Sequence, residues 1–146
     1  MPNSYQSIVV ERPLAEVWEV LRNFHDLGWA IGVIDDWRIV GDRGAGQIGA
    51  RRSINGVFFE ELLELSDLTH TLKYQIYDGP SPLSPQEVSH FIAVAAVKPV
   101  TETDAAFVEW SARWNGDDPG DVTRNFASEI FTELLRRLRS HCEGAG

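Results

Sequence analysis

The chain has 146 residues, of which 43% are hydrophobic, and its 22 acidic and 13 basic side chains give a formal net charge of −9. This length predicts one domain over residues 1–146 that buries roughly two thirds of the surface of its unfolded chain. The acidic balance argues against a nucleic-acid-binding surface. No stretch approaches the ~20 apolar residues of a membrane span, and the N-terminal residues lack the pattern of a signal peptide, so we expect a cytoplasmic protein.

The sequence also limits the kinds of site that the protein can contain. Its single cysteine, Cys142, excludes an intramolecular disulfide and a multi-cysteine metal site. It has no HExxH motif, no glycine-rich phosphate loop and no nucleophile elbow. We therefore expect no metal and no cofactor.

The N-terminal part is predicted to form a strand followed by two helical pieces. Residues 7–10 are a β-branched run, and Pro13 suits the first turn of a helix because its missing N–H would have no partner there. Apolar residues then recur at three- and four-residue spacing over residues 14–21, which is typical of an amphipathic helix. Residues 24–34 form a second short helix or an irregular apolar segment, and residues 39–40 form a short strand.

The middle of the chain has the pattern of an antiparallel meander. Asn55-Gly56 is the strongest short signal for a hairpin turn, and residues 78–85 contain three prolines and form a loop. The predicted strands cover residues 48–54, 57–65, 71–77, 88–97 and 105–114.

The last segment, residues 122–141, carries a wide apolar stripe at helical spacing that includes Phe126, Ile130 and Leu134. A helix of this length spans about 30 Å. A sheet that buries one face needs a covering layer, and this helix is the one long candidate. We therefore expect it to lie across the sheet with these three residues facing the strands, and a cavity to remain between the two layers.

Several short motifs of the sequence are typical of one protein superfamily. They are Val17-Trp18 after Pro13, Gly49-Ala50-Arg51-Arg52, Glu60-Glu61-Leu62-Leu63-Glu64-Leu65-Ser66-Asp67, Leu72-Lys73-Tyr74 and Val108-Glu109-Trp110-Ser111. Together with the pattern of the last helix, they resemble the START-like superfamily, which includes birch-pollen-allergen-like and polyketide cyclase/dehydrase-like (SRPBCC) proteins. The resemblance implies an α+β helix-grip fold: a curved antiparallel sheet of about seven strands wrapped around a long C-terminal helix, with two short helices after the first strand.

The direction of the adjacent glutamates remains open from the residues alone. Neighbours in a strand face opposite sides, so one of Glu60 and Glu61 faces the cavity. The resemblance implies that Glu60 and Leu62 face inward, whereas the alternation of apolar residues favours the face of Glu61. A two-residue Asn-Gly turn places Arg51 opposite Glu60, and a three-residue turn places Arg52 there. The family position favours Arg52.

The last strand poses a similar choice. The resemblance implies that Glu109 points into the cavity, and we expect this arrangement. It leaves Trp110 and Trp114 on the outer face or under a loop, where an exposed pair marks an interface such as that of a homodimer. Periodicity alone would bury the tryptophans instead.

These features predict that a hydrophobic or amphipathic small molecule binds between the curved sheet and the C-terminal helix, with no nucleic-acid partner. The cavity is expected to open near Asn55-Gly56 and residues 78–85. The predicted ligand contacts are Arg52, Phe58, Glu60, Leu62, Tyr74, Phe91, Glu109, Phe126, Ile130 and Leu134.

Two alternatives remain open because this fold hosts carriers, receptors, cyclases and hydrolases. One is a polyketide cyclase/dehydrase-like enzyme in which Glu60 or Glu109 acts as general acid or base and Tyr74 as a donor. The other is a module of the same fold that binds a partner through its surface.

Overall fold

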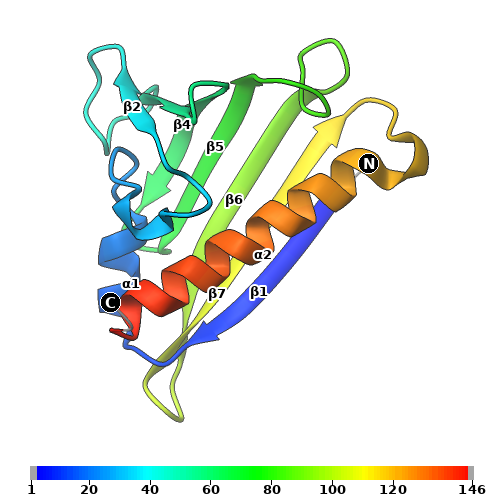
Figure 1. The fold of residues 1–146 in the computed structure, drawn as a ribbon. Coiled ribbons are helices and arrows are strands. Elements are labelled where there is room, and N and C mark those ends of the chain that lie inside the picture. Colours follow the sequence, from blue (N-terminus) through cyan, green and yellow to red (C-terminus); the bar gives the residue numbers. More distant parts are fainter. Residues whose placement is uncertain (1–2, 145–146) are drawn as a thin grey trace.

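The computed structural model describes residues 3–144, and within them seven antiparallel strands form one sheet with a long helix across one face (Figure 1). The strands lie in the order β1-β7-β6-β5-β4-β3-β2. This arrangement confirms the predicted α+β helix-grip fold. In chain order the elements are β1 (Asn3–Val10), α1 (Leu14–Leu21), η1 (Gly28–Ala30), β2 (Trp37–Val40), β3 (Arg51–Ile54), β4 (Phe58–Ser66), β5 (Thr71–Asp78), β6 (Ser89–Val100), β7 (Ala105–Asn115), η2 (Pro119–Asp121) and α2 (Val122–Cys142).

The first strand is longer than predicted, because β1 begins at Asn3 rather than at residue 7. Its first residues are polar and carry little strand signal, but all of β1 pairs with β7. The buried Ser4 hydroxyl lies 2.7 Å from the Ser128 hydroxyl on α2, so a hydrogen bond between them satisfies both. Pairing and this contact outweigh the low strand propensity of the polar residues.

The helical region after β1 follows the prediction in part. α1 is the predicted amphipathic helix, with Val17 and Trp18 buried. The second predicted helix is reduced to η1, a 3-10 turn within an otherwise irregular segment. The carboxylate of Asp26 accepts a hydrogen bond from the backbone N–H of Gly28, and Gly32 has a φ of +101°, a value that an α-helix does not contain. The segment therefore turns instead of continuing as a helix.

The C-terminal helix α2 is continuous over 21 residues, as the apolar stripe predicted. The carboxylate of Asp118 accepts hydrogen bonds from the backbone N–H groups of Thr123 and Arg124, which have no partner within the helix. α2 buries Phe131 and Leu134 and lies closest to β1 and β7 (Figure 1).

Among the helices of residues 3–144, none combines the length and apolarity needed to cross a membrane.

The position of α2 leaves the other half of the sheet to be covered differently. The helix contacts β1 and β7 at one side of the sheet, while β3, β4 and β5 lie at the other. The irregular segment around η1 also contacts α2. The inner face of β3 to β5, the segment around η1 and the side of α2 therefore surround a space, and this space holds the candidate site.

Candidate functional site

The cavity lies between the inner face of the sheet, the segment around η1 and α2. Nearly all of its lining side chains are apolar or aromatic, and its volume is about 80 Å³. Pockets of this type, apolar with a few polar groups, are the usual places where proteins bind small molecules.

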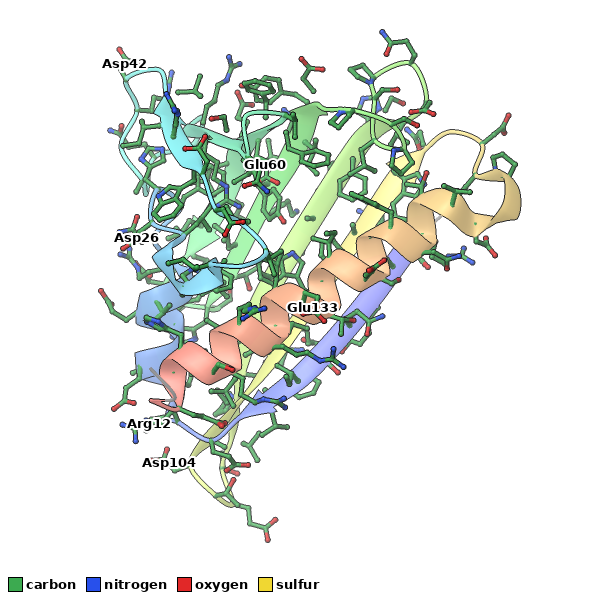
Figure 2. All side chains as sticks on the ribbon, in the orientation of Figure 1. Arg12, Asp26, Asp42, Glu60, Asp104 and Glu133 are labelled. Carbon is green, nitrogen blue, oxygen red and sulfur yellow. The ribbon has the colours of Figure 1, made fainter. Side chains whose placement is uncertain are left out.

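Most of the residues predicted to contact a ligand line this cavity. Figure 2 shows Glu60 on the side of the sheet that faces α2. Eight of the ten predicted residues are in the lining, and the two others, Leu62 and Glu109, are not. The eight are Arg52, Phe58, Glu60, Tyr74, Phe91, Phe126, Ile130 and Leu134.

A buried ion pair forms the polar part of the cavity wall. The guanidinium Nε of Arg52 donates to Oε1 of Glu60 at 2.7 Å, and the two side chains are only 6% and 9% exposed. Arg52 Nη1 donates to the backbone carbonyl of Phe24 at 2.9 Å, and the guanidinium carbon lies 3.9 Å from the centre of the Phe24 ring. These contacts hold the pair in one geometry, which a buried ion pair needs to offset the cost of desolvation.

The turn between β3 and β4 decides which arginine enters this pair. The turn has three residues, so Ile54 pairs with Phe58 and Arg52 with Glu60. The two-residue alternative is wrong because Asn55 is held by the neighbouring loop. Its backbone N–H donates to the carbonyl of Asp36 at 2.7 Å, and its side-chain oxygen accepts from the N–H groups of Asp35 and Asp36.

A β-bulge explains why the alternation of apolar residues pointed to the wrong glutamate. Leu62 pairs with Tyr74 and Glu64 with Lys73, so Leu63 has no partner on β5. The extra residue reverses the alternation, and Leu65 pairs with buried Leu72 on the inner face. Glu60 and Leu62 therefore face inward, as the resemblance implied. Glu61 faces outward, where it pairs with Arg51 at 2.8 Å.

Leu62 nevertheless does not line the cavity, which corrects its predicted role as a ligand contact. It is fully buried in the hydrophobic core. The Phe24 ring lies 6.1 Å from that of Tyr74, the residue opposite Leu62, so this part of the sheet is covered by the irregular segment. Leu62 therefore supports the wall from within the core.

The inward direction expected for Glu109 is wrong. The hydroxyl of Tyr5 donates to its Oε1 at 2.6 Å, and Lys98 lies 3.0 Å from its Oε2, both on the outer face. The hydrogen bond from Tyr5, with the charge of Lys98, lowers the pKa of Glu109. Trp110 and Trp114 are 2% and 0% exposed, so they form no exposed pair for an interface.

The reason for this correction is the size of the side chains in β7. Residues on one face of a strand share one parity, so burying two indole rings forces the intervening polar residues outward. Burial of large aromatic side chains contributes far more to stability than an inward carboxylate would. Periodicity was therefore the better guide at Glu109.

Tyr74 provides a hydrogen-bonding group at the cavity wall. The indole Nε1 of Trp110 donates to its hydroxyl oxygen at 3.1 Å. Burial, together with the charge of Glu60, raises the pKa of Tyr74. The hydroxyl therefore keeps its proton at neutral pH and can donate a hydrogen bond.

Trp29 is a cavity residue that was not predicted from the sequence. It lines the cavity and is 7% exposed, and its indole Nε1 has no hydrogen-bond partner among the described residues. It lies in the irregular segment around η1, where no periodicity indicates which side chains face inward. A signal was present in its composition, because a tryptophan within an apolar segment is usually buried.

Both loops expected at the mouth reach the cavity. Asn55, from the β3–β4 turn, and Leu83, from the loop of residues 78–85, are among the lining residues. Asn55 also donates from its side-chain nitrogen to the carbonyl of Val33, another lining residue. Hydrogen bonds of Asn55 therefore join the β3–β4 turn to residues 33–36 beside the cavity. Within residues 3–144, no three His, Cys, Asp or Glu side chains are grouped to hold a metal ion.

Comparisons with known proteins agree with this fold. A solved structure of a protein from Nitrosospira multiformis is 36% identical, with a TM-score of 0.91 over 95% of this chain and 94% of that one. The protein XoxI from Bacillus cereus is 21% identical, with a TM-score of 0.79 and coverage of 97% and 95%. A protein from Thermobifida fusca is 22% identical, with a TM-score of 0.80 and coverage of 97% and 93%.

The sequence comparisons identify the family. A search of curated protein sequences found no match. The profile of the family described as polyketide cyclase/dehydrase and lipid transport matches residues 1–143, almost the whole chain. The chain therefore belongs to the polyketide cyclase/dehydrase and lipid transport family.

Proposed function

We propose that the protein binds a small hydrophobic or amphipathic molecule in the cavity between the sheet and α2. The observation that supports this proposal best is a mainly apolar cavity with one buried ion pair, Arg52 and Glu60, in its wall. The apolar walls supply the driving force through burial of ligand surface. The polar groups then orient the ligand within the cavity.

The size of the cavity limits the ligand. A single water needs roughly 10–15 Å³ of the same kind of volume, so the cavity's 80 Å³ is several times larger. A molecule with one or a few rings is the size of ligand that we expect. A larger ligand would need the lining side chains to move apart.

A fluorescence titration tests this proposal. The neutral apolar dye N-phenyl-1-naphthylamine should bind with saturation, and Ile130→Trp should weaken its binding at least tenfold because the added indole fills the cavity. Val122→Trp is the matched control, because it adds the same side chain to α2 at a position that is 56% exposed and outside the cavity. Equal binding by both variants, or no saturable binding by the wild type, would contradict the proposal.

A second candidate function follows from the placement of Glu60. Its Oε1 is held by Arg52, but no residue among those described donates to its Oε2, and Tyr74 lines the same cavity. A carboxylate and a tyrosine hydroxyl in an apolar site can act as general base and donor in a cyclase- or dehydratase-like reaction. Such a role predicts that Glu60→Gln keeps ligand binding near normal but lowers turnover at least a hundredfold. If the protein is a carrier instead, Glu60→Gln lowers ligand affinity or stability, and neither the variant nor the wild type shows turnover.

A further inference from the structure

Two buried side-chain polar atoms lack a hydrogen-bond partner within residues 3–144. They are the indole Nε1 atoms of Trp29 and Trp114. Buried donors in folded proteins are nearly always paired, so an unpaired one needs an explanation. Trp114 stacks on Phe91 at 5.4 Å and is not in the cavity wall, whereas Trp29 is.

Among the described residues, none provides a hydrogen-bond acceptor for the indole N–H of Trp29. Its ring centre lies 6.3 Å from that of Trp110, whose own Nε1 is satisfied by the Tyr74 hydroxyl. Both tryptophans line the cavity, together with Tyr74. One wall therefore contains a paired indole N–H and an unpaired, buried one, and Trp29, which carries the unpaired donor, lines the space where a ligand would lie.

The charges in the cavity wall are already balanced. Arg52 and Glu60 form an ion pair at 2.7 Å, and no other charged side chain lines the cavity within the described residues. An added ligand charge would have to be desolvated without an unpaired opposite charge to compensate it. The wall therefore favours an uncharged ligand.

We infer that the cavity selects an uncharged apolar molecule carrying a hydrogen-bond acceptor, such as a carbonyl or ether oxygen, and that Nε1 of Trp29 donates to this acceptor. This inference rests on the proposed function and narrows its ligand class. Trp29 becomes a residue that determines specificity, since a ligand without the acceptor leaves the buried donor unpaired.

Two probes of matched shape test the inference. Acetophenone and α-methylstyrene are both neutral and carry the same phenyl ring, but the carbonyl oxygen of the first is a methylene group in the second. Binding of both is followed by two-dimensional ¹H–¹⁵N NMR of the labelled full chain. The indole N–H signals are assigned with Trp29→Phe and Trp114→Phe. Because the phenyl rings are the same, their ring-current effects on the indole signal are similar.

The expected result has two parts. In the wild type, acetophenone shifts the Trp29 indole N–H downfield, and α-methylstyrene does not. In Trp29→Phe, the preference for acetophenone over α-methylstyrene, measured as the ratio of their dissociation constants, should fall about three- to tenfold relative to the wild type. This is the contribution of one hydrogen bond. The ratio stays at its wild-type value in Trp114→Phe, which removes an indole N–H that is also unpaired but lies outside the cavity.

The outcomes separate this inference from the proposed function. If both probes bind in the cavity without a selective shift of the Trp29 signal, and the ratio is unchanged in Trp29→Phe, the inference is wrong and the proposed function stands. If neither probe binds with saturation in the cavity, both are wrong. Should Trp29→Phe fail to fold, the shift in the wild type, assigned by sequential NMR, still decides between these results.

Discussion

Two arginine–glutamate pairs lie side by side on β3 and β4 but on opposite faces of the sheet. Arg52 and Glu60 face the cavity at 2.7 Å, with side chains 6% and 9% exposed. Arg51 and Glu61 face outward at 2.8 Å, with side chains 49% and 20% exposed. The residue types, strands and distances are nearly the same, so the pairs differ mainly in burial.

This comparison shows that the environment of a pair matters more than its geometry. Water screens the outer pair and solvates either partner if the other is removed. The inner pair is largely shielded from solvent, so each charge depends on the other and on the contacts with Phe24. The inner pair should therefore respond strongly to substitution, both in stability and in ligand binding, and the outer pair only weakly.

The largest effect is expected from Arg52→Met, which leaves the Glu60 carboxylate buried without a partner. Loss of one member of a buried pair costs about 3–5 kcal/mol of unfolding free energy. Urea denaturation followed by circular dichroism measures this change. Arg51→Met is the matched control and should unfold almost like the wild type.

A double variant checks the cause of that loss. If an unpaired charge is responsible, Arg52→Met/Glu60→Leu should be more stable than Arg52→Met alone, since an apolar pair needs no solvation. A double variant as unstable as the single one, or an equal loss in Arg51→Met, would show that burial does not distinguish the two pairs.

The next largest effect is expected from Glu60→Gln. The substitution keeps the shape of the side chain but leaves Arg52 with a neutral neighbour, at a cost of order 1–3 kcal/mol. Urea denaturation gives the stability, and titration with N-phenyl-1-naphthylamine gives the affinity. Glu61→Gln should change neither measurably. A harmful Glu61→Gln with a harmless Glu60→Gln would refute the assignment of the two faces.

The smallest effect on stability is expected from Glu109→Gln on the outer face of the sheet, and it should appear mainly at acidic pH. The Tyr5 hydrogen bond, with the charge of Lys98, holds the pKa of Glu109 below its ordinary value of 4.5. A lowered pKa contributes stability above pH 4.5, and this contribution is lost as the pH falls through the folded-state value. Glu109→Gln should therefore flatten the fall in stability below pH 4.5 and alter dye binding very little. A large loss of dye binding would mean that Glu109 contributes to the cavity after all.

The sequence predicted the architecture better than the details of the site. The apolar stripe of α2 and the motifs around Trp18, Glu60 and Tyr74 were sufficient for the fold, because these patterns reflect burial on a regular element. The three-residue turn depends on hydrogen bonds between Asn55 and a loop that lies nearby in space but 20 residues earlier in the chain. The bulge depends on Leu63 having no partner on β5. Neither feature leaves a periodic signal.

The errors at the two misassigned site residues and at the one missed residue have different causes. At Glu109, the family resemblance outweighed a periodicity that correctly buried Trp110. Leu62 has the predicted direction, but the covering of its part of the sheet comes from a segment far away in sequence. Trp29 lies where the chain is irregular, so its position in the cavity wall follows from tertiary packing alone.

A methyl NMR titration with acetophenone tests binding between the sheet and α2, because it observes both faces of the sheet at once. We expect the methyl signals of Ile130, Leu134 and Ile76, which line the cavity, to shift with one common dissociation constant. Methyl signals of Leu63 and Val94, which lie outside the cavity lining, should stay in place. Saturable shifts confined to Leu63 and Val94, or no saturable shift at Ile130, would contradict binding between the sheet and α2.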